Sequence, residues 1–183
     1  VHSPENEEQL SLNTPFRERL AYDEVLANQL ALALVRSQRR RRTGRSIKSS
    51  GDLRQKLLDS IPFSLTPSQE AAADEITADL ASDQRMHRLL QGDVGSGKTV
   101  VALLGMAEAI ESGHQAALLA PTEILARQHF ATIEPLARAV GISIQLYTGR
   151  DKGTARAAIL EGFKTGSTQL AVGTHALFQE KVL

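Results

Sequence analysis

The stretch Gly92-Asp93-Val94-Gly95-Ser96-Gly97-Lys98-Thr99 matches the phosphate-binding pattern G-x-x-x-x-G-K-[ST] at every constrained position. In such a loop, glycines allow backbone N–H groups to curl around a β-phosphate. Lys98 is expected to bridge the β- and γ-phosphates, and the Thr99 hydroxyl is expected to bind Mg²⁺. A helix starting near Gly97 would add the positive end of its dipole. The stretch therefore predicts a nucleoside triphosphate site.

The sequence around this loop separates a phosphate site from a glycine-rich turn that binds nothing. His87 to Gln91 precede the loop and form a short strand candidate. After the loop, apolar residues recur at helical spacing until Gly113 supplies a stop; they are Val100, Leu103, Leu104, Ala107 and Ile110. A strand, the loop and then a helix is the arrangement in which the motif is credible. The context therefore favours nucleotide binding.

Composition excludes several other classes of protein. The 183 residues include no cysteine, which rules out disulfides and thiolate metal sites and favours a reducing cytoplasm. No apolar run approaches the roughly 20 residues of a membrane helix, and no secretory signal is recognised. The formal net charge is zero, with a mild excess of basic residues over acidic ones in residues 1–62 and the reverse in residues 63–183. DNA binding must therefore be argued from motifs.

From residue 63 onward, the pattern predicts alternating helices and strands. The expected order is a helix from Thr66-Pro67 to about Ser82, strand 88–92, helix 98–112, strand 116–121, helix 123–140, strand 142–148, helix 153–164 and strand 169–174. This alternation indicates an α/β fold with a parallel sheet covered by helices on both faces. The apolar run 116–120 predicts a central strand. Because ligands gather at the carboxyl ends of parallel strands, the phosphate loop and the segments 121–122, 148–149 and 173–174 are expected at one edge.

The first 62 residues are expected to form a connector to this α/β domain. Residues 1–14 are polar and predict an extended segment, whereas 16–42 lack Gly and Pro and predict one long helix. Its apolar side chains predict packing against something substantial. The basic run 39–42 suits either the C-terminus of that helix, which we slightly favour, or nucleic-acid phosphate. A short helix is expected at 52–60.

Three further segments carry a resemblance to a known family. They read Ala120-Pro121-Thr122-Glu123-Ile124-Leu125-Ala126-Arg127-Gln128-His129, then Tyr147-Thr148-Gly149, then Gly173-Thr174-His175-Ala176-Leu177. With the phosphate loop, they resemble the first RecA-like motor domain of superfamily 2 helicases, most closely the RecG family of bacterial translocases. Residues 19–24 and 29–32 resemble the long helix that follows the wedge domain of that family. The resemblance implies ATP- and Mg²⁺-dependent movement on branched and double-stranded DNA in recombination and repair.

The resemblance also implies roles for individual residues. Phe63 and Gln69 would read the adenine. Gln69 also suits a capping box with Thr66; both roles can hold at different moments, and we favour adenine contact. Thr122 would hold the DNA backbone, and it also suits an ordinary helix cap; the two roles are compatible. The ATP site comprises Phe63, Gln69, Gly92, Asp93, Val94, Gly95, Ser96, Gly97, Lys98 and Thr99, with Lys98 and Thr99 catalytic. The DNA-contacting set comprises Pro121, Thr122, Arg127, Gly149, Arg150, Thr174 and His175.

Two choices within the DNA-contacting set rest on local sequence. Arg127 and Gln128 stand in the same expected helix, where at least one of them belongs on a solvated face, and we favour Arg127 for DNA contact. His175 has no His, Asp or Glu at metal-ligand spacing nearby, so we expect it to face DNA or to support a residue that does, in place of binding a metal.

The chain begins at Val1 and ends at Leu183 in apolar sequence, which predicts a piece of a longer protein. The resemblance then implies that the wedge domain, the Asp-Glu motif for Mg²⁺ and the second motor domain with its arginine finger lie outside it. Because an arginine finger contributes about 10³ to 10⁵ in rate, the piece alone is expected to hydrolyse ATP negligibly.

Three other functions stay open at this point. The first is the motor of a transcription-repair coupling translocase, which has a similar Asp-Val-Gly loop; Ser96 and the preceding long helix argue for the RecG family instead. The second is a P-loop switch or scaffold without motor activity. The third is a DNA-binding module whose binding depends on salt and not on nucleotide.

Overall fold

The structure is a computed structural model that describes residues 14–40, 43–150 and 153–179. It divides the chain into two units, Val1–Thr43 and Gly44–Leu183. The first unit contains α1 (Pro15–Arg40), close to the predicted helix 16–42. The connector predicted for residues 1–14 falls almost wholly outside the described residues, as does half of the basic run, so both interpretations stay predictions.

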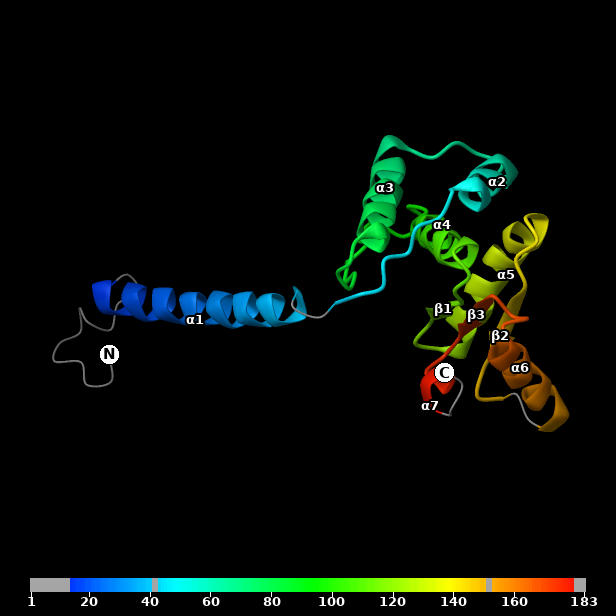
Figure 1. The fold of residues 1–183 in the computed structure, drawn as a ribbon. Helices are drawn as coiled ribbons and strands as arrows, with labels where there is room; N and C mark the ends of the chain where they lie inside the picture. The colour runs from blue at the N-terminus through cyan, green and yellow to red at the C-terminus, as the bar shows by residue number, and fades with distance from the viewer. Residues whose placement is uncertain (1–13, 41–42, 151–152, 180–183) are drawn as a thin grey trace. The chain divides into compact units, whose positions relative to one another are not determined.

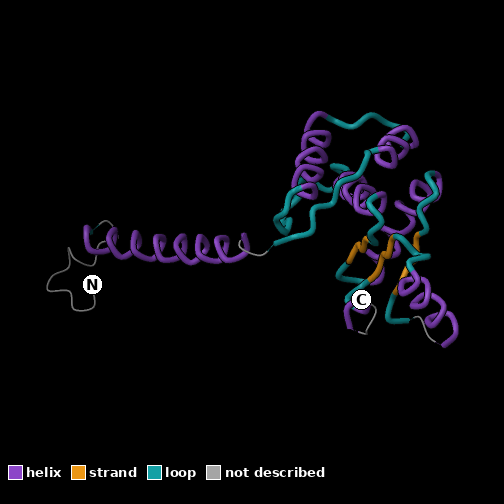
Figure 2. Tube along the Cα trace, viewed as in Figure 1, coloured by secondary structure: helices purple, strands orange, loops and turns teal. Residues whose placement is uncertain are grey.

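The second unit holds the remaining elements (Figures 1 and 2). They are α2 (Asp52–Ser60), α3 (Pro67–Ala81), α4 (Lys98–Glu111), β1 (Ala116–Leu119), α5 (Glu123–Ala139), β2 (Ile144–Tyr147), α6 (Gly153–Thr165), β3 (Leu170–Gly173) and α7 (Ala176–Gln179). The short helix α7 was not predicted. Among the described residues, no helix combines the length and the apolar character needed to cross a membrane.

The three strands form a parallel sheet in the order β1-β3-β2, which confirms the predicted α/β fold (Figure 1). All four residues of β3 are buried, as expected for the middle strand. The prediction that residues 116–120 form a central strand is wrong for the described sheet. In this sheet β1 pairs only with β3, and its residues Ala117 and Leu119 are exposed.

Helices cover the sheet on both faces. Leu170 and Val172 of β3 belong to the larger core, which includes buried residues of α4 and α5 such as Leu104 and Ile133. The intervening residue of β3, Ala171, lies in a second core with Tyr147 of β2, Phe163 of α6 and Leu177 of α7. Since alternate residues of a strand point to opposite faces, the two cores lie on opposite sides of β3.

The strand predicted at residues 88–92 is absent; the structure shows an irregular segment there. A strand requires a neighbour that supplies hydrogen bonds, and the described strands pair only with one another. Instead, Arg88 forms ion pairs with Glu75 and Asp79 of α3, the latter at 2.7 Å. Leu89 is 84% exposed. Ion pairs of Arg88 therefore connect the segment that leads into the phosphate loop to α3.

Residues 44–62 belong to the same unit as the sheet, and two carboxylates of α4 hold them there. Glu108 is only 2% exposed and accepts hydrogen bonds from the hydroxyls of Ser49 and Thr77, with Arg54 at 3.9 Å. One turn further along α4, Glu111 accepts from the Ser50 hydroxyl at 2.8 Å and from backbone amides at the start of α2, namely Gly51 at 2.9 Å and Leu53 at 3.2 Å. Gly51, the N-cap of α2, has no side chain to offer, so Glu111 caps this helix from outside it.

These contacts make the contribution of Glu111 to stability depend on pH. Burial would raise the pKa of Glu111, but hydrogen bonds from Ser50, Gly51, Leu53 and Asp52 outweigh it and lower the pKa below its ordinary value of 4.5. A carboxylate whose pKa is lowered by folding stabilises the folded state above its unfolded pKa and loses this effect as pH falls through the folded pKa.

We therefore expect Glu111→Gln to lower the free energy of unfolding at pH 7, and we expect this effect to shrink as the pH falls below 4.5 and through the lowered pKa of folded Glu111. Urea unfolding of both chains at a series of pH values measures the difference. A gap between them that stays constant across this range would contradict the assignment.

Candidate nucleotide site and sheet edge

The phosphate loop folds around the ammonium group of its own lysine. Lys98 Nζ donates hydrogen bonds to the carbonyl oxygens of Gly92 at 2.7 Å and Asp93 at 2.6 Å, and it lies 3.4 Å from Ser96 Oγ. Gly95 and Gly97 adopt left-handed backbone angles, with φ of 82° and 79°, that other residues rarely reach. The structure thus brings the predicted loop residues together around one cation.

The loop leads directly into the N-terminus of α4. Lys98 and Thr99 are the first two residues of the helix, and Gly97 is its N-cap without any side-chain cap. The first turn also contains no acidic residue. The amides and the positive dipole end at this terminus are therefore not countered by a local carboxylate, which suits an anion.

Gln69 connects the start of α3 to this loop. Its Oε1 accepts from the Thr66 amide at 2.8 Å, and Thr66 Oγ1 accepts from the Gln69 amide at 3.3 Å, so the predicted capping box is present. In addition, Gln69 Nε2 donates to the Ser96 carbonyl at 2.9 Å. A Cβ added to Gly97 would collide with the same Nε2 atom. Gln69 therefore packs against the phosphate loop, a contact that the sequence did not reveal.

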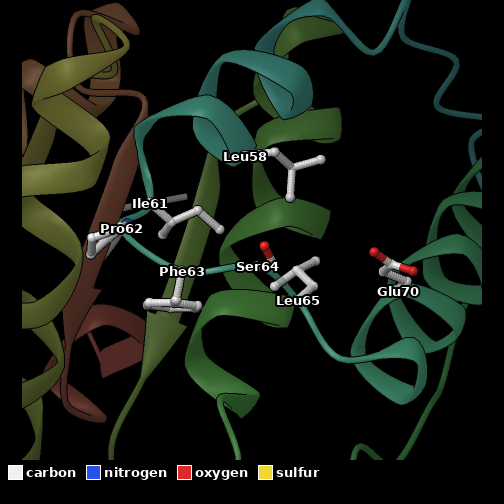
Figure 3. Close-up of a pocket in the computed structure, with 7 residues that line it drawn as sticks. All are labelled: Leu58, Ile61, Pro62, Phe63, Ser64, Leu65 and Glu70. Carbon is white, nitrogen blue, oxygen red and sulfur yellow. The ribbon is translucent and has the colours of Figure 1, made fainter.

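A pocket of about 440 Å³ lies beside this end of α3. Figure 3 shows the segment that carries Phe63 running between α2 and α3, with Leu58 and Glu70 projecting from these two helices. The full lining is Leu58, Ile61, Pro62, Phe63, Ser64, Leu65 and Glu70. Phe63 is 51% exposed, so its ring is available for contact. Glu70, which lines the pocket, and Gln69, which contacts the phosphate loop, are consecutive residues in the first turn of α3.

The register of the sheet brings the other predicted segments to one edge. Leu119, Gly173 and Tyr147, the last residues of the three strands, stand opposite one another. The chain leaves these positions into the segments 120–122, 174–175 and 148–150. Pro121, Thr122, Gly149, Arg150 and His175 are exposed there, and Thr174 is half-buried. The nearness of the phosphate loop to this edge stays a prediction.

Glu123, the first residue of α5, joins two of the predicted DNA-contacting residues. Its Oε1 accepts from Nε and Nη2 of Arg127, and its Oε2 lies 3.1 Å from Arg150 Nε. Next to it, Thr122 Oγ1 accepts from the Leu125 amide at 3.3 Å, so Thr122 is indeed the cap of α5. The Glu123–Arg127 pair has the i,i+4 spacing that the sequence reveals, whereas nothing in the sequence points to Arg150 as a partner.

Metal binding by protein side chains alone has little support in this part of the molecule. Among the described residues, no group of three or more His, Asp or Glu side chains is placed to hold an ion. A metal at the phosphate loop would have to share its ligands with a nucleotide.

A parallel α/β sheet with a glycine-rich loop that opens a helix defines a P-loop nucleotide-binding domain of RecA-like type. The DEAD/DEAH box helicase family model matches residues 66–183. The chain therefore belongs to the DEAD/DEAH box helicase family.

Individual relatives narrow the similarity further, and they confirm the predicted resemblance to RecG. The chain is 45% identical to the ATP-dependent DNA helicase RecG of Haemophilus influenzae over 92% of its length and 24% of that protein. It is 43% identical to RecG of Bacillus subtilis over its whole length and 26% of that protein. A solved structure of RecG bound to a three-way DNA junction matches 91% of this chain with a TM-score of 0.83 and 42% identity, covering 23% of that chain. The chain thus spans about a quarter of the length of these relatives.

Proposed function

We propose that the whole protein is an ATP-dependent DNA helicase that translocates on branched and double-stranded DNA, regressing stalled forks and moving junctions in recombination and repair. The observation that carries the proposal is the phosphate loop, which gathers around Lys98 at the open N-terminus of α4. The similarity to RecG proteins supports the branched-DNA substrate. Residues 63–183 would form the first motor domain and 1–62 the connector from a wedge domain. A bacterial cytoplasm is the proposed location.

ATP would bind with its phosphates in the loop 92–97. Lys98 Nζ would exchange its bonds to the loop carbonyls for bonds to the β- and γ-phosphates, and the first-turn amides of α4 would face the same anion. Thr99 Oγ would hold Mg²⁺. A single hydroxyl fits this ion, because Mg²⁺ uses few protein ligands and completes its shell with water and phosphate oxygens. When bound, the ion would neutralise charge on the phosphates.

The adenine would lie near Phe63 and Gln69. The pocket that Phe63 lines reaches the first turn of α3, where Gln69 contacts the phosphate loop (Figure 3). In this structure the Gln69 amide is engaged by Thr66 and Ser96. A side-chain amide has two N–H donors and two acceptor lone pairs, so Gln69 keeps one of each for the base while both bonds persist. Contact with the base through Gln69 would couple recognition of the base to the shape of the phosphate loop.

The loops at the carboxyl edge of the sheet would hold the DNA backbone. The segments 121–122, 149–150 and 174–175 lie on this edge, as the strand register shows. They offer hydroxyls, backbone amides and the guanidinium of Arg150, which are typical donors to phosphate, and contacts of this kind carry no sequence information. A second motor domain would close on ATP and open after hydrolysis. This movement would shift its own contacts with the DNA backbone relative to those of the first motor domain.

The test is ATP hydrolysis by the whole protein with three DNA states: none, linear duplex and a three-way junction. We expect the junction to stimulate turnover more than duplex of equal length. Failure of any DNA to stimulate would favour a P-loop protein without motor activity. Fork regression only in the presence of RNA polymerase would favour a transcription-repair coupling translocase. Junction binding that depends on salt but not on nucleotide would favour a DNA-binding module.

A further inference from the structure

Glu123 binds two arginines that come from different parts of the sheet edge. Arg127 lies one turn along the same helix, and its Nε and Nη2 donate to Glu123 Oε1 at 3.0 and 2.9 Å. Arg150 comes from the segment after β2, and its Nε lies 3.1 Å from Oε2 of the same carboxylate. One side chain therefore contacts two cations, of which one lies in α5 and the other in the segment after β2.

The three side chains differ in exposure in a way that indicates which one positions the others. The Glu123 side chain is 22% exposed, whereas those of Arg127 and Arg150 are 54% and 81% exposed. Glu123 also stands at the N-terminus of α5, where the helix dipole favours a carboxylate. The carboxylate is thus the fixed member, and the two guanidinium groups project from it into solvent.

The bonds to Glu123 leave donors available on both arginines. A guanidinium has five N–H donors; Glu123 accepts hydrogen bonds from two of those on Arg127 and forms an ion pair with Arg150. Planar guanidinium groups bind phosphate through two parallel N–H bonds. Thr122, a residue already proposed to contact the DNA backbone, directly precedes Glu123 in the chain.

We propose that Glu123 is a positioning residue that holds Arg127 and Arg150 ready to grip one stretch of DNA backbone. The inference rests on the proposed function. Holding two flexible side chains before binding removes part of the ordering cost that they would otherwise incur when the DNA arrives. A carboxylate that merely competed with phosphate for these arginines would have the opposite effect, because its removal would free them.

Glu123→Gln in the whole protein distinguishes a carboxylate that positions the arginines from one that competes with phosphate, because the two roles predict opposite changes in DNA affinity. Removing a negative charge from a DNA-binding surface should strengthen binding if electrostatics alone matters. If Glu123 positions the arginines, we expect binding to a three-way junction to weaken about threefold to tenfold, as measured by fluorescence anisotropy. The slope of log affinity against log salt should also become shallower, because fewer phosphates are neutralised.

Glu134→Gln is the matched control, because Glu134 pairs with Arg138 at 2.8 Å in the same helix and at the same i,i+4 spacing. It makes the same change of charge away from the sheet edge and should leave junction affinity unchanged or slightly higher. A double-mutant cycle adds a readout that a purely structural role would not move. Arg150→Ala should weaken binding less in the Glu123→Gln background than in the original chain.

Binding by Glu123→Gln that equals or exceeds binding by Glu134→Gln would overturn the inference, as would full additivity with Arg150→Ala. Thermal unfolding of each variant shows whether a loss of binding comes from misfolding. If it does for Glu123→Gln, Arg150→Ala alone must then weaken binding for the inference to stand. Absence of junction binding by the unmodified protein would instead refute the proposed function.

Discussion

Lys98→Ala is expected to lower the ATP turnover number of the whole protein by about 10²-fold to 10³-fold, the usual effect of removing one donor to transition-state charge. The physical reason is the place of Nζ among the loop carbonyls at the start of α4. Alanine cannot replace the cation that would bridge the β- and γ-phosphates. Junction binding should persist, because the lysine belongs to a different group of contacts from those at the sheet edge.

The measurement is steady-state hydrolysis with saturating junction DNA, together with anisotropy of the same DNA. Lys164→Ala is a suitable control, since Lys164 is an exposed residue near the end of α6 and has no assigned role. Turnover by Lys98→Ala within a few-fold of that control would remove the basis of the nucleotide assignment. Loss of junction binding together with turnover would show that the two sites are not separable.

Glu108→Ala is expected to lower the free energy of unfolding by about 3 kcal/mol, in the range found when one partner of a buried charged network is removed. Ser49 and Thr77 would lose the acceptor of their hydroxyl hydrogen bonds, and Arg54 would lose a nearby carboxylate. The missing side-chain volume would also leave a cavity against the core of the second unit.

Urea unfolding of the chain measures this loss. Glu75→Ala provides the comparison, because Glu75 is also an ion-paired acid in a helix but its side chain is 61% exposed. Exposed pairs contribute at most about 1 kcal/mol, so this variant should be nearly neutral. A Glu108→Ala chain no less stable than Glu75→Ala would mean that the contacts of Glu108 do not hold residues 44–62 in place.

Most of the correct predictions of the fold rest on local signals, such as helix caps and helix stops. Thr66, Pro67 and Gln69 place the start of α3, and the observed capping box has the predicted members. Gly113 ends the segment of α4 as expected, with a positive φ of 80°. Each of these signals depends only on neighbours in the chain, which is why it can be read without the fold.

The wrong predictions concern the sheet, where residues that are distant in sequence determine which segments pair as strands. Leu89 and Leu90 resemble a strand in sequence, but Arg88 finds Glu75 and Asp79 on α3 and no described strand pairs with the segment. The apolar run at β1 suggested a central strand, yet Ala117 and Leu119 are exposed. Periodicity reports apolar character and cannot tell which strand lies beside which.

The candidate site also has a part that could be predicted from local sequence and a part that could not. The phosphate loop was predictable residue by residue, because its chemistry lies within eight consecutive positions. The contact between Gln69 and Ser96 and the bond between Glu123 and Arg150 each join residues 27 positions apart. Such contacts depend on how the helices pack around the sheet, and no local pattern marks them.

The contacts between α4 and residues 49–53 determine where the chain should be truncated when this domain is studied in isolation. The family match begins at residue 66, which invites truncation at that point. Such a cut would remove Ser49 and Arg54 from the buried Glu108, and it would take Leu57 out of the core. The second unit begins upstream of the matched region, at Gly44, and shortened chains should therefore retain that extra stretch.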